Sequence, residues 1–295
     1  MATGTGRAAE PAGGDLTLPR GDDGIVTADD GARLAVTVAG PPPGEGLPPV
    51  VLAHCWTGSR AVWGPVARRL VAAGHRVVLY DQRGHGASSV GADPISIDRL
   101  GDDLATVVEQ FDLRDAVLAG HSMGGMSVMA CACRHPLLAK ERVRGLVLVA
   151  TAAHGLAGGG RDRFWRIVLW RETVNRLMVH PRLGRVFVRR TFGRSPAKAH
   201  IEATRALFVA TPPGVRRDCA EAMSEMDLRH PLREVQTPAT VVLGRKDRLI
   251  VNRLTRAIVD HAPGARLVEL PRAGHMLPLE RPDEVTAAIA GSRRS

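Results

Sequence analysis

Short apolar runs recur along this chain, and longer segments between them repeat apolar residues every three or four positions. Runs of four to eight apolar residues indicate buried strands, whereas the longer periodic segments indicate helices packed on one side. Strands are expected around Ile25, Leu34, Val50, Val77, Val117, Leu146, Val241 and Leu267. Since helical segments separate most of the later strands, the order predicts an antiparallel start followed by parallel β-α-β units. The predicted fold class is α/β, with a mostly parallel eight-stranded sheet flanked by helices.

Composition divides the chain into three parts. Residues 1–23 are rich in Gly, Ala and Pro and lack the apolar stretch of a signal peptide, so we expect a flexible N-terminal tail. Residues 24–153 and 235–291 hold the expected strands and should form the α/β core. Residues 154–234 lie between them and show helical patterns at 197–210 and 216–226. This middle part should be a helical insertion.

The cysteines and the apolar content indicate a globular protein with reduced thiols. An apolar fraction of 44% over 295 residues is enough for a sizeable core. No segment approaches membrane-spanning length without charges. The four cysteines, Cys55, Cys131, Cys133 and Cys219, show neither metal-ligand nor disulfide spacing. The sequence therefore predicts a cytoplasmic protein, and no feature of it indicates an oligomeric state.

The net charge of +10 is concentrated in one segment. Residues 161–200 contain ten arginines and one lysine against Asp162 and Glu172, which leaves +9 in this segment alone. Binding to nucleic acid would call for aromatic stacking platforms or a known module, and the sequence shows neither. We therefore expect no nucleic-acid partner.

The basic segment also contains an amphipathic helical pattern. Its apolar positions are Phe164, Ile167, Trp170, Val174 and Leu177, with arginines at 163, 166, 171 and 176 among them. Such a helix can lie in a membrane interface, line an acyl pocket or bind an acidic substrate group. The simplest interpretation is that the apolar stripe packs inward while the arginines face water. Peripheral membrane contact through this basic segment remains one of the open alternatives.

The most informative motif is Gly-His-Ser-Met-Gly at residues 120–124. It follows an apolar strand at 116–119 and precedes a helical segment at 126–134. A strand, a G-x-S-x-G turn and a helix in this order indicate a nucleophile elbow, which exposes Ser122 at the end of the strand. Gly120 and Gly124 are expected to pass so closely that a side chain on either would clash. The alternative is a glycine-rich turn whose serine has no catalytic role.

Two later strands supply partners for Ser122. A serine becomes a nucleophile when a histidine accepts its proton and a carboxylate orients that histidine. The strand at 239–243 is followed by Asp247, and the strand at 266–270 is followed by His275. We therefore predict a catalytic triad in which His275 is the base and Asp247 orients it.

These motifs carry a resemblance to a known superfamily. The segments 54–58 (His-Cys-Trp-Thr-Gly), 81–88 (Asp-Gln-Arg-Gly-His-Gly-Ala-Ser) and 120–125, together with Asp247 and Gly274-His275, resemble those of α/β-hydrolases. More narrowly, the chain is similar to bacterial single-domain hydrolases and acyltransferases. The resemblance covers residues 24–291, with the middle third matched by position alone. It implies the α/β-hydrolase fold, with residues 154–234 as a helical, Arg-rich cap over the active site.

The resemblance also implies an oxyanion hole. Two backbone N–H groups would meet the negative charge on the attacked carbonyl oxygen, one from Met123 and one from Trp56. The chain departs from the family pattern at Cys55, where glycine is usual. We expect this cysteine to restrict the loop and to be a packed residue rather than a nucleophile.

The remaining polar residues near the motifs are expected to support the fold. The loop at 81–88 should buttress the site, and His54, His85 and His121 should support it rather than bind a metal, because no ligand spacing is present. Asp102 and Asp103 lie on the helical segment 97–111 and are expected to face solvent.

The sequence thus predicts a serine hydrolase that cleaves a carboxylic ester of a small-molecule acyl substrate without metal or cofactor. An acyltransferase, a carbon–carbon bond hydrolase or a cofactor-free perhydrolase could use the same triad. A ligand sensor on a hydrolase scaffold and a membrane-associated lipase are further alternatives. Haloalkane dehalogenases and epoxide hydrolases are disfavoured, because they carry Asp where this chain has Ser122.

Overall fold

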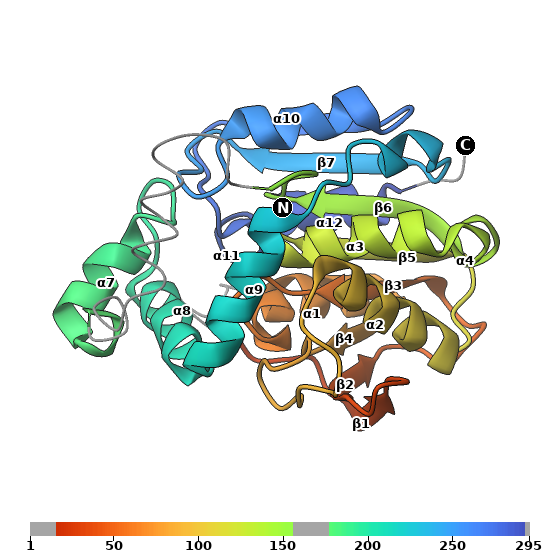
Figure 1. Ribbon diagram of the computed structural model, residues 1–295, viewed down its shortest axis with the longest axis horizontal. Coiled ribbons are helices and arrows are strands. Elements are labelled where there is room, and N and C mark those ends of the chain that lie inside the picture. The colour runs from red at the N-terminus through yellow and green to blue at the C-terminus, as the bar shows by residue number, and fades with distance from the viewer. Residues whose placement is uncertain (1–15, 156–176, 293–295) are drawn as a thin grey trace, which may run out of the picture.

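Eight strands form one sheet in the computed structural model, which describes residues 16–155 and 177–292 (Figure 1). The strands are β1 (Gly21–Thr27), β2 (Arg33–Ala39), β3 (Leu47–Ala53), β4 (His75–Tyr80), β5 (Ala116–His121), β6 (Val143–Val149), β7 (Ala239–Gly244) and β8 (Arg266–Leu270). Their order is β1-β2-β4-β3-β5-β6-β7-β8. The β1–β2 and β2–β4 pairs are antiparallel, and every pair from β4 to β8 is parallel. The predicted fold class is confirmed.

Helices cover both faces of the sheet. They are η1 (Arg60–Trp63), α1 (Gly64–Ala72), α2 (Ile97–Gln110), α3 (Met123–Arg134), α4 (Pro136–Arg142), α7 (Pro181–Arg189), α8 (Lys198–Ala210), α9 (Pro213–Glu225), η2 (Pro231–Glu234), α10 (Asn252–His261), α11 (Leu277–Glu280) and α12 (Pro282–Ala290). Within the described residues none of these helices is long and apolar enough to cross a bilayer.

The central strands are apolar along their whole length because both of their faces are buried. In β3, Val51 and Ala53 join the core beneath α2 and α3, while Val50 and Leu52 join the core beneath α1 and α12. Parallel strands between two helical layers read as continuous apolar runs for this reason.

The sheet begins earlier than the sequence indicated. β1 starts at Gly21, which pairs with Ala39, so three residues expected in the tail belong to the sheet. The strand expected around Ile25 is present, and its residues are exposed except for Val26. Its first four residues carry no apolar side chain, so no local signal marked the earlier start. Leu16 and Leu18 also pack against the apolar core.

The segment between β6 and β7 is helical in its described part, with α7, α8 and α9 gathered beyond one end of the sheet (Figure 1). An apolar cluster joins it to the core, where Met178, Phe192 and Phe208 pack with Cys55 and Met276. The amphipathic helix expected from Phe164 to Leu177 falls almost entirely outside the described residues.

Candidate active site

Ser122 occupies a strained turn between β5 and α3. Its backbone has φ 55° and ψ −116°, a conformation that L-residues rarely adopt. A Cβ on Gly120 would lie 2.2 Å from the carbonyl oxygen of Gly124, and a Cβ on Gly124 would lie 2.2 Å from the carbonyl oxygen of Ala53. The predicted need for both glycines is confirmed. Helix α3 begins directly at Met123, three residues before the predicted start.

Neighbouring strands hold the backbone of this turn. The N–H of Ser122 donates to the carbonyl of Val149 at 2.9 Å, and the hydroxyl of Thr151 donates to the carbonyl of Ser122 at 2.7 Å. Val149 is the last residue of β6 and Thr151 follows it closely, so the serine lies at the carboxyl edge of the sheet. Ser122 itself is 6% exposed.

Asp247 and His275 meet at the same edge. The Nδ1 of His275 lies 2.8 Å from Oδ2 of Asp247, and their side chains are 5% and 2% exposed respectively. The other carboxylate oxygen of Asp247 accepts from the N–H groups of Leu249 at 2.8 Å and Ile250 at 3.0 Å. The carboxylate is therefore fixed by its own loop and presents one oxygen to the imidazole. The structure brings these two predicted residues together.

His121 links the serine turn to the histidine loop. Its Nε2 lies 2.8 Å from the carbonyl oxygen of His275 and donates to it, since a carbonyl can only accept. The two rings lie 5.0 Å apart between centroids. Burial lowers the pKa of His121 well below its ordinary value, so the ring is neutral and acts as a fixed donor. His121, the residue before Ser122, thus fixes the backbone carbonyl of His275, the candidate base.

Trp56 and Met123 lie where the resemblance placed an oxyanion hole, after β3 and at the start of α3. In the described part of the chain the backbone N–H of neither residue donates to an acceptor. The indole Nε1 of Trp56 donates to the carbonyl of Arg216 at 3.1 Å, which ties the loop to α9. The left-handed residue of this loop is Thr57, with φ 56°, and Cys55 does not occupy a conformation that would call for glycine. Burial raises the pKa of the Cys55 thiol to about 12, which leaves it a packed thiol.

His54 and His85 are buried and structural. The Nε2 of His54 accepts from the N–H of Gln82 at 2.9 Å, and its Nδ1 donates to the carbonyl of Cys55 at 2.8 Å. His85 accepts from the N–H of Thr57 at 3.2 Å. Burial lowers the pKa of His54 to about 4 and that of His85 to about 3. Both rings are therefore neutral links between the loops after β3 and β4.

The loop at 81–88 is anchored by Asp81. This carboxylate accepts from the N–H of Arg60 at 2.7 Å, from its guanidinium at 3.0 Å and from the N–H of Ala87 at 3.0 Å. Gly86, with φ 54°, passes so close that a Cβ would lie 2.2 Å from the carboxylate. Through Asp81, the loop at 81–88 therefore fixes the backbone at Arg60 and at Ala87.

Asp103 was predicted to face solvent, and that prediction is wrong. The residue is 1% exposed and receives two hydrogen bonds, at 2.7 and 2.6 Å, from the fully buried guanidinium of Arg83. Asp30 accepts from the same guanidinium at 2.8 Å. A buried arginine needs such partners, because an unpaired charge in the core is very unfavourable. Asp102, one position along α2, is partly exposed and pairs with Arg134.

Glu280 is a site residue that the sequence did not reveal. Its carboxylate accepts from the N–H groups of Gly274 at 3.0 Å and Met276 at 3.1 Å, on either side of His275. It also accepts from the N–H of Gly193 in the helical region at 2.7 Å. The carbonyl of Thr191 accepts from the N–H of His275 at 2.7 Å. The loop that carries the histidine is therefore held by an acid and by the helical region together.

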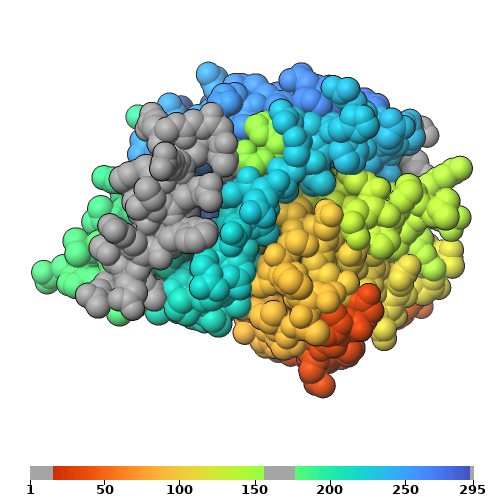
Figure 2. All heavy atoms as spheres, viewed as in Figure 1, coloured from red at the N-terminus to blue at the C-terminus, as the bar shows by residue number. Residues whose placement is uncertain are grey.

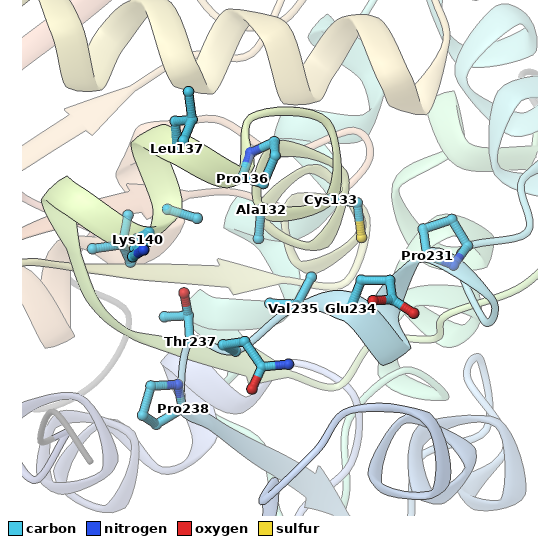
Figure 3. Close-up of a pocket in the computed structure, with 13 residues that line it drawn as sticks. Ala132, Cys133, Pro136, Leu137, Lys140, Pro231, Glu234, Val235, Thr237 and Pro238 are labelled. Atoms are coloured by element: carbon cyan, nitrogen blue, oxygen red, sulfur yellow. The ribbon is translucent and has the colours of Figure 1, made fainter.

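A hollow lies at the amino ends of β6 and β7, whereas the candidate site lies at the carboxyl ends of the strands. Figure 3 shows the residues that line this hollow. It lies between α3, α4 and the segment before β7, and includes Cys133, Lys140, Glu234 and Thr237. The pKa of the Cys133 thiol is raised to about 12 by burial, so this cysteine is not a reactive thiolate. Among the described residues, no group of three or more His, Cys, Asp and Glu side chains could hold a metal ion.

A family model with the description alpha/beta hydrolase fold matches residues 48–282. The chain belongs to this family. The matched region contains the serine turn, Asp247 and His275, together with the helical region between β6 and β7.

Several α/β hydrolases of known name are similar to the chain. A relative from Caulobacter sp. strain K31, RutD, whose name assigns it provisionally to carbamate hydrolysis, is 27% identical over 241 residues, covering 81% of this chain and 88% of its own. The enol-lactonase structure from Burkholderia xenovorans LB400 is 26% identical with a TM-score of 0.76, over 89% of this chain and 96% of that one. A thermophilic esterase structure from Thermogutta terrifontis is 28% identical with a TM-score of 0.73, over 91% and 96%. Hydrolase activity is the common property of these relatives.

Proposed function

We propose that this α/β hydrolase cleaves a carboxylic ester through a covalent acyl-enzyme on Ser122. The observation that carries the proposal is the 2.8 Å contact between His275 and Asp247, nearly excluded from water, on the sheet edge that also presents the strained Ser122. An elbow serine beside an oriented histidine is the arrangement that nucleophilic acyl transfer needs. The enol-lactonase and the esterase, both acting on esters by name, support an ester rather than another acyl compound.

In the proposed reaction His275 takes the proton of Ser122 as its oxygen attacks the ester carbonyl carbon. Asp247 holds the imidazole through Nδ1 and stabilises the imidazolium that forms. The N–H groups of Trp56 and Met123 stabilise the oxyanion, and the positive end of α3 adds to this. The imidazolium then protonates the leaving alcohol, and water activated by the same histidine releases the acid.

Hydrolysis of p-nitrophenyl esters from acetate to palmitate tests the proposal. Turnover should fall at least about a thousandfold in Ser122→Ala with the fold intact, because the covalent step is lost. Ser127→Ala is the matched control, since Ser127 is a buried serine on α3 that donates to Gln82 at 2.7 Å. Full turnover in Ser122→Ala would refute the proposal.

A second measurement distinguishes hydrolysis from the alternatives. A fluorophosphonate probe should label intact protein once, and peptide mass spectrometry should place the label on Ser122. Labelling without ester turnover would indicate an acyltransferase, a carbon–carbon hydrolase or a slow sensor, and would contradict the ester proposal.

A further inference from the structure

Helix α7 carries exposed aliphatic side chains at the outer edge of the molecule. Figure 1 places α7 at the end of the helical region farthest from the sheet, and its green atoms project at that edge in Figure 2. Val179 just before the helix is 55% exposed, Leu183 is 50% exposed and Val186 is 60% exposed. Because Leu183 and Val186 are three positions apart on the helix, they lie on one side of it.

Cations surround these aliphatic side chains. The exposed arginines are Arg182, Arg185, Arg189 and Arg190, followed by Arg194 and Lys198. Residues 177–200 contain no Asp or Glu. Arg185 pairs with Glu202 at 3.4 Å, whereas the other five have no carboxylate within ion-pair distance in the part of the chain that the structure describes. The helix therefore presents uncompensated positive charge and apolar surface together.

A groove between α7 and α8 also combines apolar surface with positive charge. Val186 and Ile201 contribute aliphatic surface to it, and Arg185, Arg189 and Lys198 lie around it. Glu202 also lines the groove, and its carboxylate is paired with Arg185 and Arg205. An aliphatic floor with a cationic rim complements an acyl chain beneath a phosphate group, since guanidinium groups bind phosphate through paired hydrogen bonds.

We propose that the α7 face, defined as Val179, Leu183 and Val186 with Arg182, Arg189 and Arg190, docks on an anionic lipid surface. Its aliphatic side chains enter the boundary between headgroups and acyl chains, and its arginines meet the lipid phosphates. A nucleic acid would complement the charge alone and would leave the aliphatic side chains without a partner. An anionic membrane complements both.

The α7 face is joined to the candidate active site by a short path. Just beyond the end of α7, the N–H of Thr191 donates to the carbonyl of Val188 at 2.9 Å, and the carbonyl of Thr191 accepts from the N–H of His275 at 2.7 Å. The segment that follows α7 is therefore hydrogen-bonded to the loop that carries the candidate base. The docking itself does not depend on the proposed ester hydrolysis.

Vesicle sedimentation with the full chain tests the proposal. The vesicles are phosphatidylcholine alone and phosphatidylcholine mixed with phosphatidylglycerol, at low and high salt. Three double variants are compared with the wild type: Arg182→Glu with Arg189→Glu, Leu183→Ser with Val186→Ser, and Arg233→Glu with Arg253→Glu as a charge-matched control on exposed arginines elsewhere. Circular dichroism and thermal unfolding establish that each variant folds.

The wild type should sediment with the mixed vesicles, more weakly at high salt, and not with phosphatidylcholine alone. The charge reversal on α7 should lower partitioning about tenfold or more, and the serine pair should lower it as well. The control pair should stay close to the wild type. Equal losses in both charge pairs would indicate a net-charge effect and overturn the proposal. Vesicle binding unaffected by the serine pair, or duplex DNA binding as tight as vesicle binding, would also overturn it.

Discussion

The carboxylate of Glu280 accepts a hydrogen bond from the N–H of Gly193 at 2.7 Å, so an acid of the core holds the helical region. The same carboxylate holds the N–H groups on both sides of His275. Gly193 and Gly274 lie in direct contact there, since a Cβ on Gly274 would lie 2.4 Å from the nitrogen of Gly193. One half-buried carboxylate thus joins three separate backbone groups.

Glu280→Gln should impair both stability and turnover. A glutamine keeps the shape but turns an N–H₂ group toward backbone N–H donors, and a buried unsatisfied donor costs about 1–3 kcal/mol. If the proposed ester hydrolysis holds, kcat should fall by roughly tenfold to a hundredfold, because the base is no longer fixed in place, while KM changes less. Thermal unfolding and ester kinetics measure the two effects. Glu284→Gln, at an exposed carboxylate on α12, is the control and should leave both quantities unchanged.

Asp103→Asn should destabilise the fold far more than Asp102→Asn. Asp103 and Asp30 together pair with the fully buried Arg83, and replacing the charged acceptor Asp103 by a neutral amide loses charge-assisted hydrogen bonding worth about 1.5–3 kcal/mol per bond. Asp102 is partly exposed, and its pairing with Arg134 is worth about 1 kcal/mol or less. Chemical denaturation of the two variants measures the difference. Similar losses in both would contradict the buried network.

Gly120→Ala should disrupt the serine turn. The new Cβ would meet the backbone of Gly124 at 2.2 Å, and backbone cannot yield as a flexible side chain can. We expect a loss of about 3 kcal/mol or more in unfolding free energy, or failure to fold. Gly214→Ala in the first turn of α9 is the control, because no atom lies within 4 Å of its added Cβ. That variant should be neutral or stabilised by up to about 1 kcal/mol, and a Gly120→Ala protein of wild-type stability would rule out the tight elbow.

Three buried histidines should make the protein acid-sensitive. The pKa values of His54 and His85 fall to about 4 and about 3 in the folded state, and that of His121 falls well below its ordinary value, in each case mainly through burial. An unfolded histidine binds its proton near pH 6.5, so folding stability is full above that pH and declines as the pH falls toward 4. Each histidine adds a slope of up to about 1.4 kcal/mol per pH unit in that window.

Urea unfolding at a series of pH values from 7 to 5 measures this slope. In His54→Gln the slope should be shallower, because one depressed pKa is gone and Gln can still accept from Gln82. His230→Gln, at an exposed histidine, should keep the wild-type slope. Identical slopes in all three proteins would show that buried histidines do not set the pH dependence.

The sequence predicted the strands well because their apolar runs are a local signal. β5 and β7 are buried along their whole length, and each is followed within a few residues by a candidate catalytic side chain. The placement of Asp247 beside His275 followed from strand order, since parallel strands end at one edge. By contrast, the start of α3 depended on the elbow geometry, which lets the helix begin directly after Ser122.

Other features could not be read from the sequence because their partners are distant along the chain. Asp103 lies on an amphipathic helix, and nothing local shows that Arg83 points into the core beneath it. Glu280 resembles any acid near a short helix until Gly193, 87 positions away, is brought to it. The strand around Ile25 was predicted, but the first residues of β1 carry no apolar side chains and are recognised only through their pairing with β2.

The hydrogen bond from the N–H of His275 to the carbonyl of Thr191 ties the helical region to the core. The helical region is not an exchangeable accessory, because it completes the hydrogen bonding of the loop that carries the candidate base. A chimera that receives the helical region of another hydrolase will keep an ordered base where the graft offers a carbonyl to His275 and an N–H to Glu280. Exchanges of this region that bring a new specificity must therefore keep a backbone carbonyl at position 191 and a backbone N–H at position 193 in the same places.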